Sequence, residues 1–194
     1  MQDLQRKPQR CRWPAEDDEL MIQYHDEEWG VAVHDDRKLF EFIVLESSQA
    51  GLSWKTVLHK RENYRKAFHG FDYRKIAEYT TQDLDRLLND KGIIRNRLKI
   101  LATINNAKRF LEIQKEFGSF DTYIWGFVGR SVINDIQSMK DVVARTELSD
   151  QIALDMKKRG FKFMGSTIVY AHMQAIGMVD DHENHCFRKN LKTE

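Results

Sequence analysis

This chain contains very little proline, and this scarcity bears on which secondary structure the sequence permits. The only two prolines, Pro8 and Pro14, precede the first long periodic stretch, so nothing after them forbids long helices. No apolar run approaches the roughly 20 residues that a membrane-spanning helix needs. The polar stretch 1–10 also lacks the apolar core of a secretory signal. We therefore expect neither a membrane protein nor a secreted one, with the cytoplasm as the default compartment.

Flexible linkers and an excess of charge are missing as well. The 194 residues contain no Gly/Ser-rich linker, no low-complexity tract and no evident repeat, which predicts a single domain over 1–194, with one or two lobes. Lys and Arg number 31 against 30 Asp and Glu, for a net charge of +1. Any binding to nucleic acid therefore has to come from local basic patches.

Cysteine is scarce, and its two occurrences lie near histidines at opposite ends of the chain. Cys11 and His25 lie near the start, whereas His182 and Cys186 lie near the end. Two thiolates and two imidazoles suit tetrahedral zinc, and one shared ion would join the termini. Spacing alone leaves three alternatives open: zinc, a disulfide, which a non-secreted chain disfavours, and two unrelated buried thiols. His185 competes with His182 as a ligand.

The hydrophobic pattern has helical spacing along most of the chain, and strand signals are weak, so the expected fold is all-α. The residues expected to cap helices are Asp35 or Asp36, Ser53, Asp72, Ser149 and Ser166. The expected helices cover residues 17–25, 36–50, 54–68, 73–78, 81–88, 96–117, 120–127, 148–159 and 167–176. The polar segment 129–147 is expected to be a loop or a partner surface.

The segment 87–95, LLNDKGIIR, joins two expected helices through a turn that contains Gly92. This is the outline of a helix-hairpin-helix near 84–100, whose backbone N–H groups and helix dipole favour a phosphate. Arg95, Arg97 and Lys99 add positive charge alongside. Such hairpins usually have two glycines separated by one residue, and Ile94 replaces the second. By itself the segment is therefore more typical of an ordinary turn, and the basic stretches 55–66 and 157–162 are more typical of solvated helix faces.

Several motifs, taken in order, resemble one bacterial family, the 3-methyladenine DNA glycosylases I. They are RCRW (10–13), YHDEEWGV (24–31), LESSQAGLSW (45–54), KRENYR (60–65), GIIR (92–95), KKRGFKF (157–163), and DH (181–182) with Cys186. The QAGLSW pattern is highly specific, and on these motifs the chain is identified as a member of the family.

The resemblance implies an all-α helix-hairpin-helix DNA glycosylase fold with a zinc site that joins the N- and C-terminal segments. It implies that the zinc is structural, that its ligands are Cys11, His25, His182 and Cys186, and that there is no organic cofactor. The implied protein is a monomer of the bacterial cytoplasm, in use on the nucleoid. Its implied partner is double-stranded DNA that contains 3-methyladenine.

The implied reaction is hydrolysis of the N-glycosidic bond, which leaves an abasic site. No lysine stands out as an imine-forming nucleophile, so we expect a monofunctional enzyme without strand cleavage. N3-methylation makes the purine cationic and its bond weak, so complementarity to the cation and a water nucleophile can suffice. Glu46 matches the family's pocket carboxylate, and it can accept a hydrogen bond from the exocyclic amine of adenine, a donor that guanine lacks there. Asp121 has no expected role.

A glycosylase extrudes the damaged nucleotide and needs aromatic faces to hold it. Tyr24 and Trp54 match the family's base-pocket aromatics, and Trp13 is expected nearby. Core packing is the expectation for Trp125, and Trp29 fits either role.

DNA contacts are expected from Gly51 and Leu52 and, at the hairpin, from Gly92, Arg95 and Arg97. The turn with Leu52 is expected to enter the duplex as a wedge that fills the vacated space. Its alternative is a leucine buried in the turn.

The chain departs from the family pattern in a few places. Ser47 and Ser48 replace a frequent Gly-Gln or Gly-Ala pair, Ala32 stands where proline is common, and His172 occupies a position that is often apolar. Two other hypotheses compete with the glycosylase: a non-catalytic module on the same fold that senses alkylation damage or binds DNA, and a zinc-stapled interaction protein.

Overall fold

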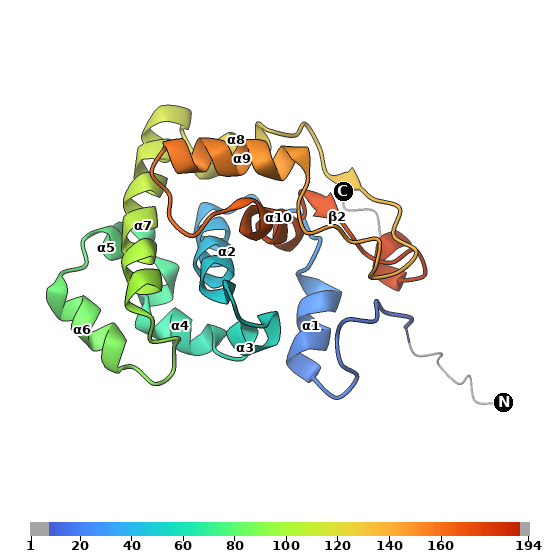
Figure 1. The fold of residues 1–194 in the computed structure, drawn as a ribbon, viewed down its shortest axis with the longest axis horizontal. Coiled ribbons are helices and arrows are strands. Elements are labelled where there is room, and N and C mark those ends of the chain that lie inside the picture. The colour runs from blue at the N-terminus through green and yellow to red at the C-terminus, as the bar shows by residue number, and fades with distance from the viewer. Residues whose placement is uncertain (1–7, 191–194) are drawn as a thin grey trace.

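A computed structural model describes residues 8–190, and most of them are helical (Figure 1). The helices of this range are α1 (Glu19–Glu27), α2 (Asp36–Gln49), α3 (Trp54–Leu58), α4 (Arg61–Ala67), α5 (Tyr73–Ala77), α6 (Thr81–Asn89), α7 (Arg97–Phe117), α8 (Phe120–Trp125), α9 (Glu147–Lys158) and α10 (Ser166–Ala175), with short 3-10 turns η1 (His69–Phe71) and η2 (Phe187–Asn190). The predicted helical fold is confirmed. None of these helices is long and apolar enough to cross a membrane.

Side-chain caps fix several helix starts where the sequence predicts them. Asp35 accepts a hydrogen bond from the backbone N–H of Lys38, and Ser53 accepts one from Thr56. These oxygens satisfy N–H groups that have no partner within their own helix. Two expected caps differ: Thr146 caps α9 in a capping box with Ser149, and Gly165 precedes α10.

The helix expected over 54–68 is two helices. α3 ends at Leu58 and α4 begins at Arg61. The chain tightens between them, because the N–H of Lys60 donates to the carbonyl of Val57 only three residues back. A change of this kind leaves the apolar spacing almost intact, so the sequence pattern does not reveal it.

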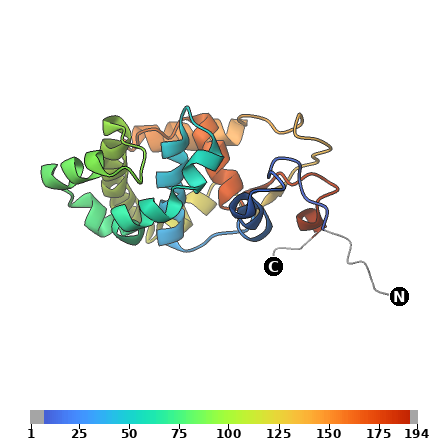
Figure 2. The same cartoon turned by 90° about the horizontal axis from the view of Figure 1, so that it is seen from below.

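α2 runs through the middle of the molecule, between α7 and α10 (Figure 1). Ten consecutive residues of this helix, 39–48, are buried, so it is covered on all sides. Its C-terminal end therefore carries buried side chains directly toward the turn that leads into α3. In Figure 2 that turn, coloured teal, projects beyond the neighbouring helices.

The two ends of the described chain meet on one side of the molecule (Figure 2). The N–H of Phe187 donates to the carbonyl of Gln9, and the N–H of Arg12 donates to the carboxylate of Glu183. Two short strands, β1 (Val132–Ile133) and β2 (Val179–Asp180), pair in parallel with Val132 opposite Val179. The all-α expectation missed this pair, because two residues are too few for an alternating pattern.

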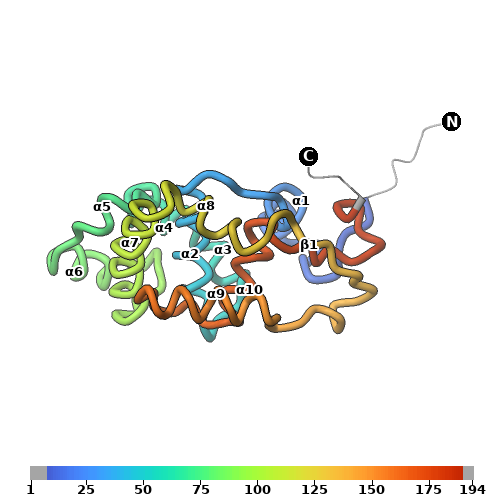
Figure 3. Tube along the Cα trace, turned by 90° about the horizontal axis from the view of Figure 1, so that it is seen from above, coloured from blue at the N-terminus to red at the C-terminus, as the bar shows by residue number. Residues whose placement is uncertain are grey.

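Segment 129–147 is a loop, as predicted, apart from β1 and from Glu147, the first residue of α9. It sweeps around the end of the molecule that carries both termini before it reaches α9 (Figure 3). Asn184 holds it there: its N–H donates to the carbonyl of Ile136, and its side-chain oxygen accepts from the Ile136 N–H. The loop is thus fastened to the C-terminal segment.

Candidate active site and DNA-facing surface

A cavity of about 200 Å³ lies where α1, α2, α3 and α10 converge with the 129–147 loop. Its lining residues are Trp13, Tyr24, Trp29, Glu46, Gln49, Trp54, Met139, Val142, Ala171 and Gln174. All four residues predicted to bind or act on the base are therefore brought together. Gln49, Met139 and Val142 were not predicted as lining residues.

The cavity has aromatic walls. The rings of Tyr24 and Trp54 lie with centroids 5.0 Å apart, and Trp13 packs edge-on against Trp29 at 5.2 Å. Within residues 8–190, the indole N–H groups of Trp13 and Trp54 are buried and have no hydrogen-bond partner. Unpaired buried donors are costly, so a ligand that accepts from them would gain more than an ordinary hydrogen bond.

Glu46 is the carboxyl group that lines the cavity, and its side chain is only 2% exposed. Its Oε2 has no hydrogen-bond partner among the described residues. Burial raises the pKa of Glu46 to about 8, because the charged form loses its hydration. Burial, and then the nearby Glu46 carboxyl, raises the pKa of Tyr24 as well. Burial thus favours a neutral carboxyl, and a cation bound beside it would favour the carboxylate.

A larger hollow of about 580 Å³ lies on another face, beside α1 and α4. Its charges already pair with one another: Arg61 donates to Glu28 and Glu41, and Lys38 donates to Glu28. The cavity around Glu46 is therefore the better candidate for a site that binds and transforms a ligand.

The turn after α2 leaves the cavity toward solvent. Gly51 has a φ of +77°, a conformation that favours glycine, and a Cβ there would meet nothing within 4 Å. Leu52 is 41% exposed, which rules out the buried-leucine alternative. Gln49, one turn earlier, lines the cavity. An exposed apolar side chain therefore stands directly beyond the rim of the aromatic cavity.

The predicted hairpin lies between α6 and α7, and its amide groups are largely paired. The N–H of Gly92 donates to Asp90 Oδ1 at 2.7 Å, and the N–H of Ile94 donates to the hydroxyl of Tyr64. A Cβ at Gly92 would lie 3.0 Å from Asn63 and from Asp90, so close packing requires glycine there. A phosphate at the Gly92 amide would have to displace the Asp90 carboxylate.

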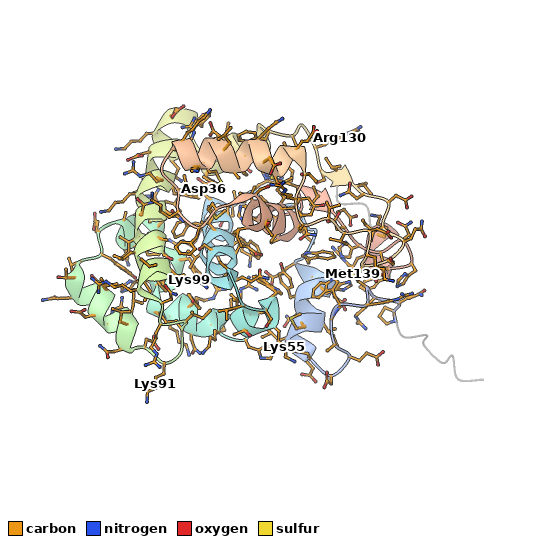
Figure 4. All side chains as sticks on the ribbon, viewed as in Figure 1. Asp36, Lys55, Lys91, Lys99, Arg130 and Met139 are labelled. Carbon is orange, nitrogen blue, oxygen red and sulfur yellow. The ribbon has the colours of Figure 1, made fainter. Side chains whose placement is uncertain are left out.

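Basic side chains around the hairpin divide into two groups. Arg95 and Arg97 are exposed, and within residues 8–190 neither forms an ion pair. Lys91 extends outward at the hairpin (Figure 4). Lys99, expected to add surface charge beside them, is instead buried, and its ammonium group donates to backbone carbonyls of α2 and the following turn. That expectation is wrong because the carbonyls come from a distant part of the sequence.

A buried cluster of sulfur and nitrogen atoms joins the two chain ends. The donor atoms of Cys11, His25 and Cys186 all lie within 4.8 Å of one another. The ring centroid of His182 lies 5.1 Å from that of His25, and its buried Nε2 has no hydrogen-bond partner in the described chain. His185, the competing ligand, instead has its Nε2 on the carbonyl of Arg10.

The surroundings of the cluster favour metal binding. Nδ1 of His25 lies 2.7 Å from Asp26 Oδ1, and Nδ1 of His182 lies 2.8 Å from Asp180 Oδ1. Carboxylates placed in this way orient each imidazole so that Nε2 is free to bind a metal. The thiol of Cys11 next to Cys186 lowers the pKa of Cys186. Three donors thus lie at the spacing of metal ligands, and the buried Nε2 of the adjacent His182 would be the fourth in a tetrahedral set.

Other residues singled out in the sequence lie outside these sites. Asp121 pairs with His34 at the surface, and the indole N–H of Trp125 donates to the carbonyl of Val33. His172 is fully buried, and burial lowers its pKa to about 3, so it is neutral at physiological pH. The hydroxyl of Ser47 donates to the carbonyl of Val44 in its own helix.

Comparisons with known proteins agree with this geometry. The methyladenine glycosylase family model matches residues 13–189. A DNA-3-methyladenine glycosylase of Haemophilus influenzae is 48% identical over 178 residues, which cover 91% of this chain and 96% of the relative. DNA-3-methyladenine glycosylase 1 of Escherichia coli K12 is 47% identical, with coverages of 92% and 95%.

Solved structures show the same likeness. A crystal structure of 3-methyladenine DNA glycosylase I is 51% identical and has a TM-score of 0.89, with 92% of this chain and 98% of that chain covered. The Staphylococcus aureus glycosylase I, described for its recognition of 3-methyladenine, is 35% identical with a TM-score of 0.88 and coverages of 91% and 94%. On the family model and these relatives, the chain belongs to the methyladenine glycosylase family.

Proposed function

We propose that the protein excises 3-methyladenine from alkylated double-stranded DNA. It hydrolyses the N-glycosidic bond without strand cleavage and leaves an abasic site. The observation that carries this proposal is Glu46, a buried carboxyl in an aromatic cavity, one of whose oxygens has no hydrogen-bond partner within residues 8–190. The names of the related proteins give independent support, because they specify 3-methyladenine.

Glu46 and the aromatic walls select the base by charge and hydrogen bonding. The N3-methylated nucleoside is a cation, and aromatic faces such as those of Tyr24 and Trp54 attract cations. Its exocyclic amine donates to the Glu46 carboxylate. Entry of the cation offsets the desolvation that raises the pKa of Glu46. The base then takes the electron pair of the glycosidic bond and departs as neutral 3-methyladenine with little need for acid catalysis, while water adds to the sugar carbon and releases a proton.

The DNA is held from two sides in this proposal. Arg95 and Arg97 neutralise backbone phosphates beside the hairpin, and Gly92 lets the hairpin turn pack closely against Asn63 and Asp90. Leu52, on the turn that Gly51 shapes, enters the duplex and fills the space left by the extruded nucleotide.

The Cys11–His25–His182–Cys186 cluster would hold a structural zinc ion. With four protein ligands, such an ion cross-links the chain ends and leaves no open position for substrate. Support comes from the clustered donors, the unpartnered Nε2 of His182 and the carboxylates behind both histidines. Trp13 lies two residues after Cys11, and Trp29 packs against His182 at 4.6 Å, so the cluster also buttresses the cavity wall.

The decisive experiment is chromatography of the bases that the purified protein releases from methylated DNA. We expect a 3-methyladenine peak, with 7-methylguanine largely retained in the DNA. A folded, zinc-loaded protein that binds methylated DNA but releases no base would instead be a damage-sensing module. A protein without salt-dependent DNA binding would be an interaction protein.

Replacement of Arg95 by alanine should weaken DNA binding in a salt-dependent way. One lost phosphate contact reduces the slope of log K against log salt by about 0.9. Fluorescence anisotropy with a short duplex at several salt concentrations measures this slope. Lys115→Ala, an exposed change at the far end of α7, serves as the control. An unaltered slope in Arg95→Ala would remove this residue from the interface.

Met139 should limit the size of the base that enters. It lines the cavity from the 129–147 loop, so Met139→Ala enlarges the space beside the bound base. We expect the rate of 3-ethyladenine excision relative to 3-methyladenine to rise about 3- to 10-fold. Val143→Ala is the matched control, because Val143 is exposed on the same loop and does not line the cavity. Equal ratios in both variants would contradict this role of Met139.

A further inference from the structure

Lys99 lies in the first turn of α7, directly after the hairpin, and it is only 8% exposed. Its Nζ donates to the carbonyl of Ser48 at 2.8 Å and to the carbonyl of Ala50 at 2.7 Å. Figure 4 shows Lys99 between α7 and the lower end of α2. These two carbonyls belong to the end of α2 and to the turn that carries Leu52. A side chain from the hairpin region therefore holds the turn between α2 and α3 that carries Leu52.

This placement is costly, so it needs a compensating gain. A lysine in the first turn of a helix opposes the helix dipole, and burial disfavours its charge. The carbonyls at the end of α2 offer the compensation, because they have no partner within their own helix and lie at its negative pole. α2 has no basic residue in its own last turn. Lys99 supplies that charge from a different helix.

The turn beyond Ala50 has little other support from the core. Gly51 has open space around it, and Leu52 is 41% exposed. The N–H of Leu52 donates to the carbonyl of Gln49, which closes the turn on itself. The two bonds from Lys99 attach the base of this closed turn to α7. They therefore fix the separation between the hairpin and Leu52.

We propose that Lys99 is a positioning residue that couples the grip of the hairpin on the DNA backbone to the insertion of Leu52 into the duplex. The proposal rests on the proposed glycosylase function. Two other roles do not fit the geometry. Burial keeps the ammonium group away from phosphates, and its pairing with two carbonyls leaves it unsuited to act as a nucleophile on the sugar.

The test compares duplex DNA with denatured DNA, because only a stacked duplex needs the wedge. In Lys99→Met we expect single-turnover release of 3-methyladenine from methylated duplex to fall about 10- to 100-fold. Release from the same DNA after denaturation should fall less than about 3-fold, because the base cavity is intact. Lys99→Arg, which keeps the charge, should recover part of the duplex rate. Lys108→Met, an exposed change on α7, should leave both rates unaltered. Equal losses on duplex and denatured DNA would overturn the proposal.

A double-mutant cycle adds a second criterion. If Lys99 acts through Leu52, then Lys99→Met combined with Leu52→Ala should be no slower on duplex DNA than the slower single variant. If the fold-loss in rate of the double variant equals the product of the two single losses, the residues act independently and the proposal is overturned.

A binding measurement separates this proposal from the glycosylase function. The probe is a duplex with a stable abasic-site analogue opposite 2-aminopurine, whose fluorescence changes when Leu52 enters the stack. Lys99→Met should reduce this change while the salt dependence of binding stays that of the wild type. A full fluorescence change in Lys99→Met would overturn the proposal even if the wild-type protein released no base. If Lys99→Met does not fold, Lys99→Gln, which removes the charge and keeps a shorter polar side chain, carries the same measurements with the same expected results.

Discussion

Replacement of Glu46 by glutamine is expected to abolish most base excision and, at the same time, to stabilise the folded protein at alkaline pH. Glutamine keeps an oxygen that accepts from the exocyclic amine, but it has no charge to match the cationic base. Groups that match charge in a closed site are worth about 100-fold or more in rate, so we expect a loss of that size in single-turnover release of 3-methyladenine. Zinc content and fold should be unaltered.

The gain in stability follows from the raised pKa of Glu46. Burial raises that pKa from an ordinary 4.5 to about 8. Between these values the folded protein keeps a proton that the unfolded chain releases, so the free energy of unfolding falls as pH rises through this window. The loss levels off above about pH 8 and amounts to a few kcal/mol. The Glu46→Gln variant has no ionisable group at this position and therefore does not lose stability in this way as pH rises.

Thermal unfolding at a series of pH values measures this difference. The melting temperature of Glu46→Gln should exceed that of the wild type by little near pH 5 and by a growing margin toward pH 8. Glu78→Gln is the control, because Glu78 is exposed and should show no such trend. A margin that stays constant or shrinks with pH would show that Glu46 is already ionised in the folded protein over this pH range.

Excision by the wild type should also depend on pH. If the carboxylate is the active form, kcat/KM rises with pH toward about 8, the pKa of Glu46 in the free protein. Tyr24, its titratable neighbour, stays neutral across this range because burial raises its pKa. The residual activity of Glu46→Gln should lack the rise. The same rise in both proteins would assign it to another group.

Local chemistry in the sequence was enough to predict most of the helices and several of their starts, but not the break between α3 and α4 or the caps of α9 and α10. Asp35 and Ser53 act within three residues of themselves, and short-range capping is visible in a sequence. The grouping of Tyr24, Glu46 and Trp54 also agreed with expectation, although their motifs came from a family resemblance and not from spacing. The raised pKa of Glu46 was beyond prediction, because it depends on how completely other helices cover α2.

Non-local contacts account for what the sequence did not reveal. Lys99 lies close to Arg95 and Arg97 in the sequence and is basic like them. It is nevertheless buried, because its ammonium group donates to two carbonyls at the end of α2 and in the following turn. Met139 reaches the cavity only because its loop is fastened to Asn184 more than 40 positions later. Neither relation leaves a periodic or compositional signal.

Replacement of Cys186 by alanine is expected to remove zinc and to destabilise the protein together. A structural ion contributes its binding free energy to folding, and an incomplete ligand set loses much of it. We expect the free energy of unfolding to fall by more than about 4 kcal/mol, a range reserved for lost metals, disulfides or core packing. Zinc content by elemental analysis and urea unfolding at neutral pH measure the two effects on one preparation.

His185→Ala is the matched control for this variant. His185 adjoins Cys186 in sequence, but its Nε2 pairs with the carbonyl of Arg10 and not with the cluster. It should keep its zinc and lose only about 1 kcal/mol, the worth of one hydrogen bond. Full zinc occupancy in Cys186→Ala would reject this ligand set. Loss of zinc in His185→Ala alone would show that His185, and not His182, is the fourth ligand.

If the ligand set is correct, Cys186→Ala should also bind free 3-methyladenine less tightly, because Trp13 and Trp29 line the cavity next to the cluster.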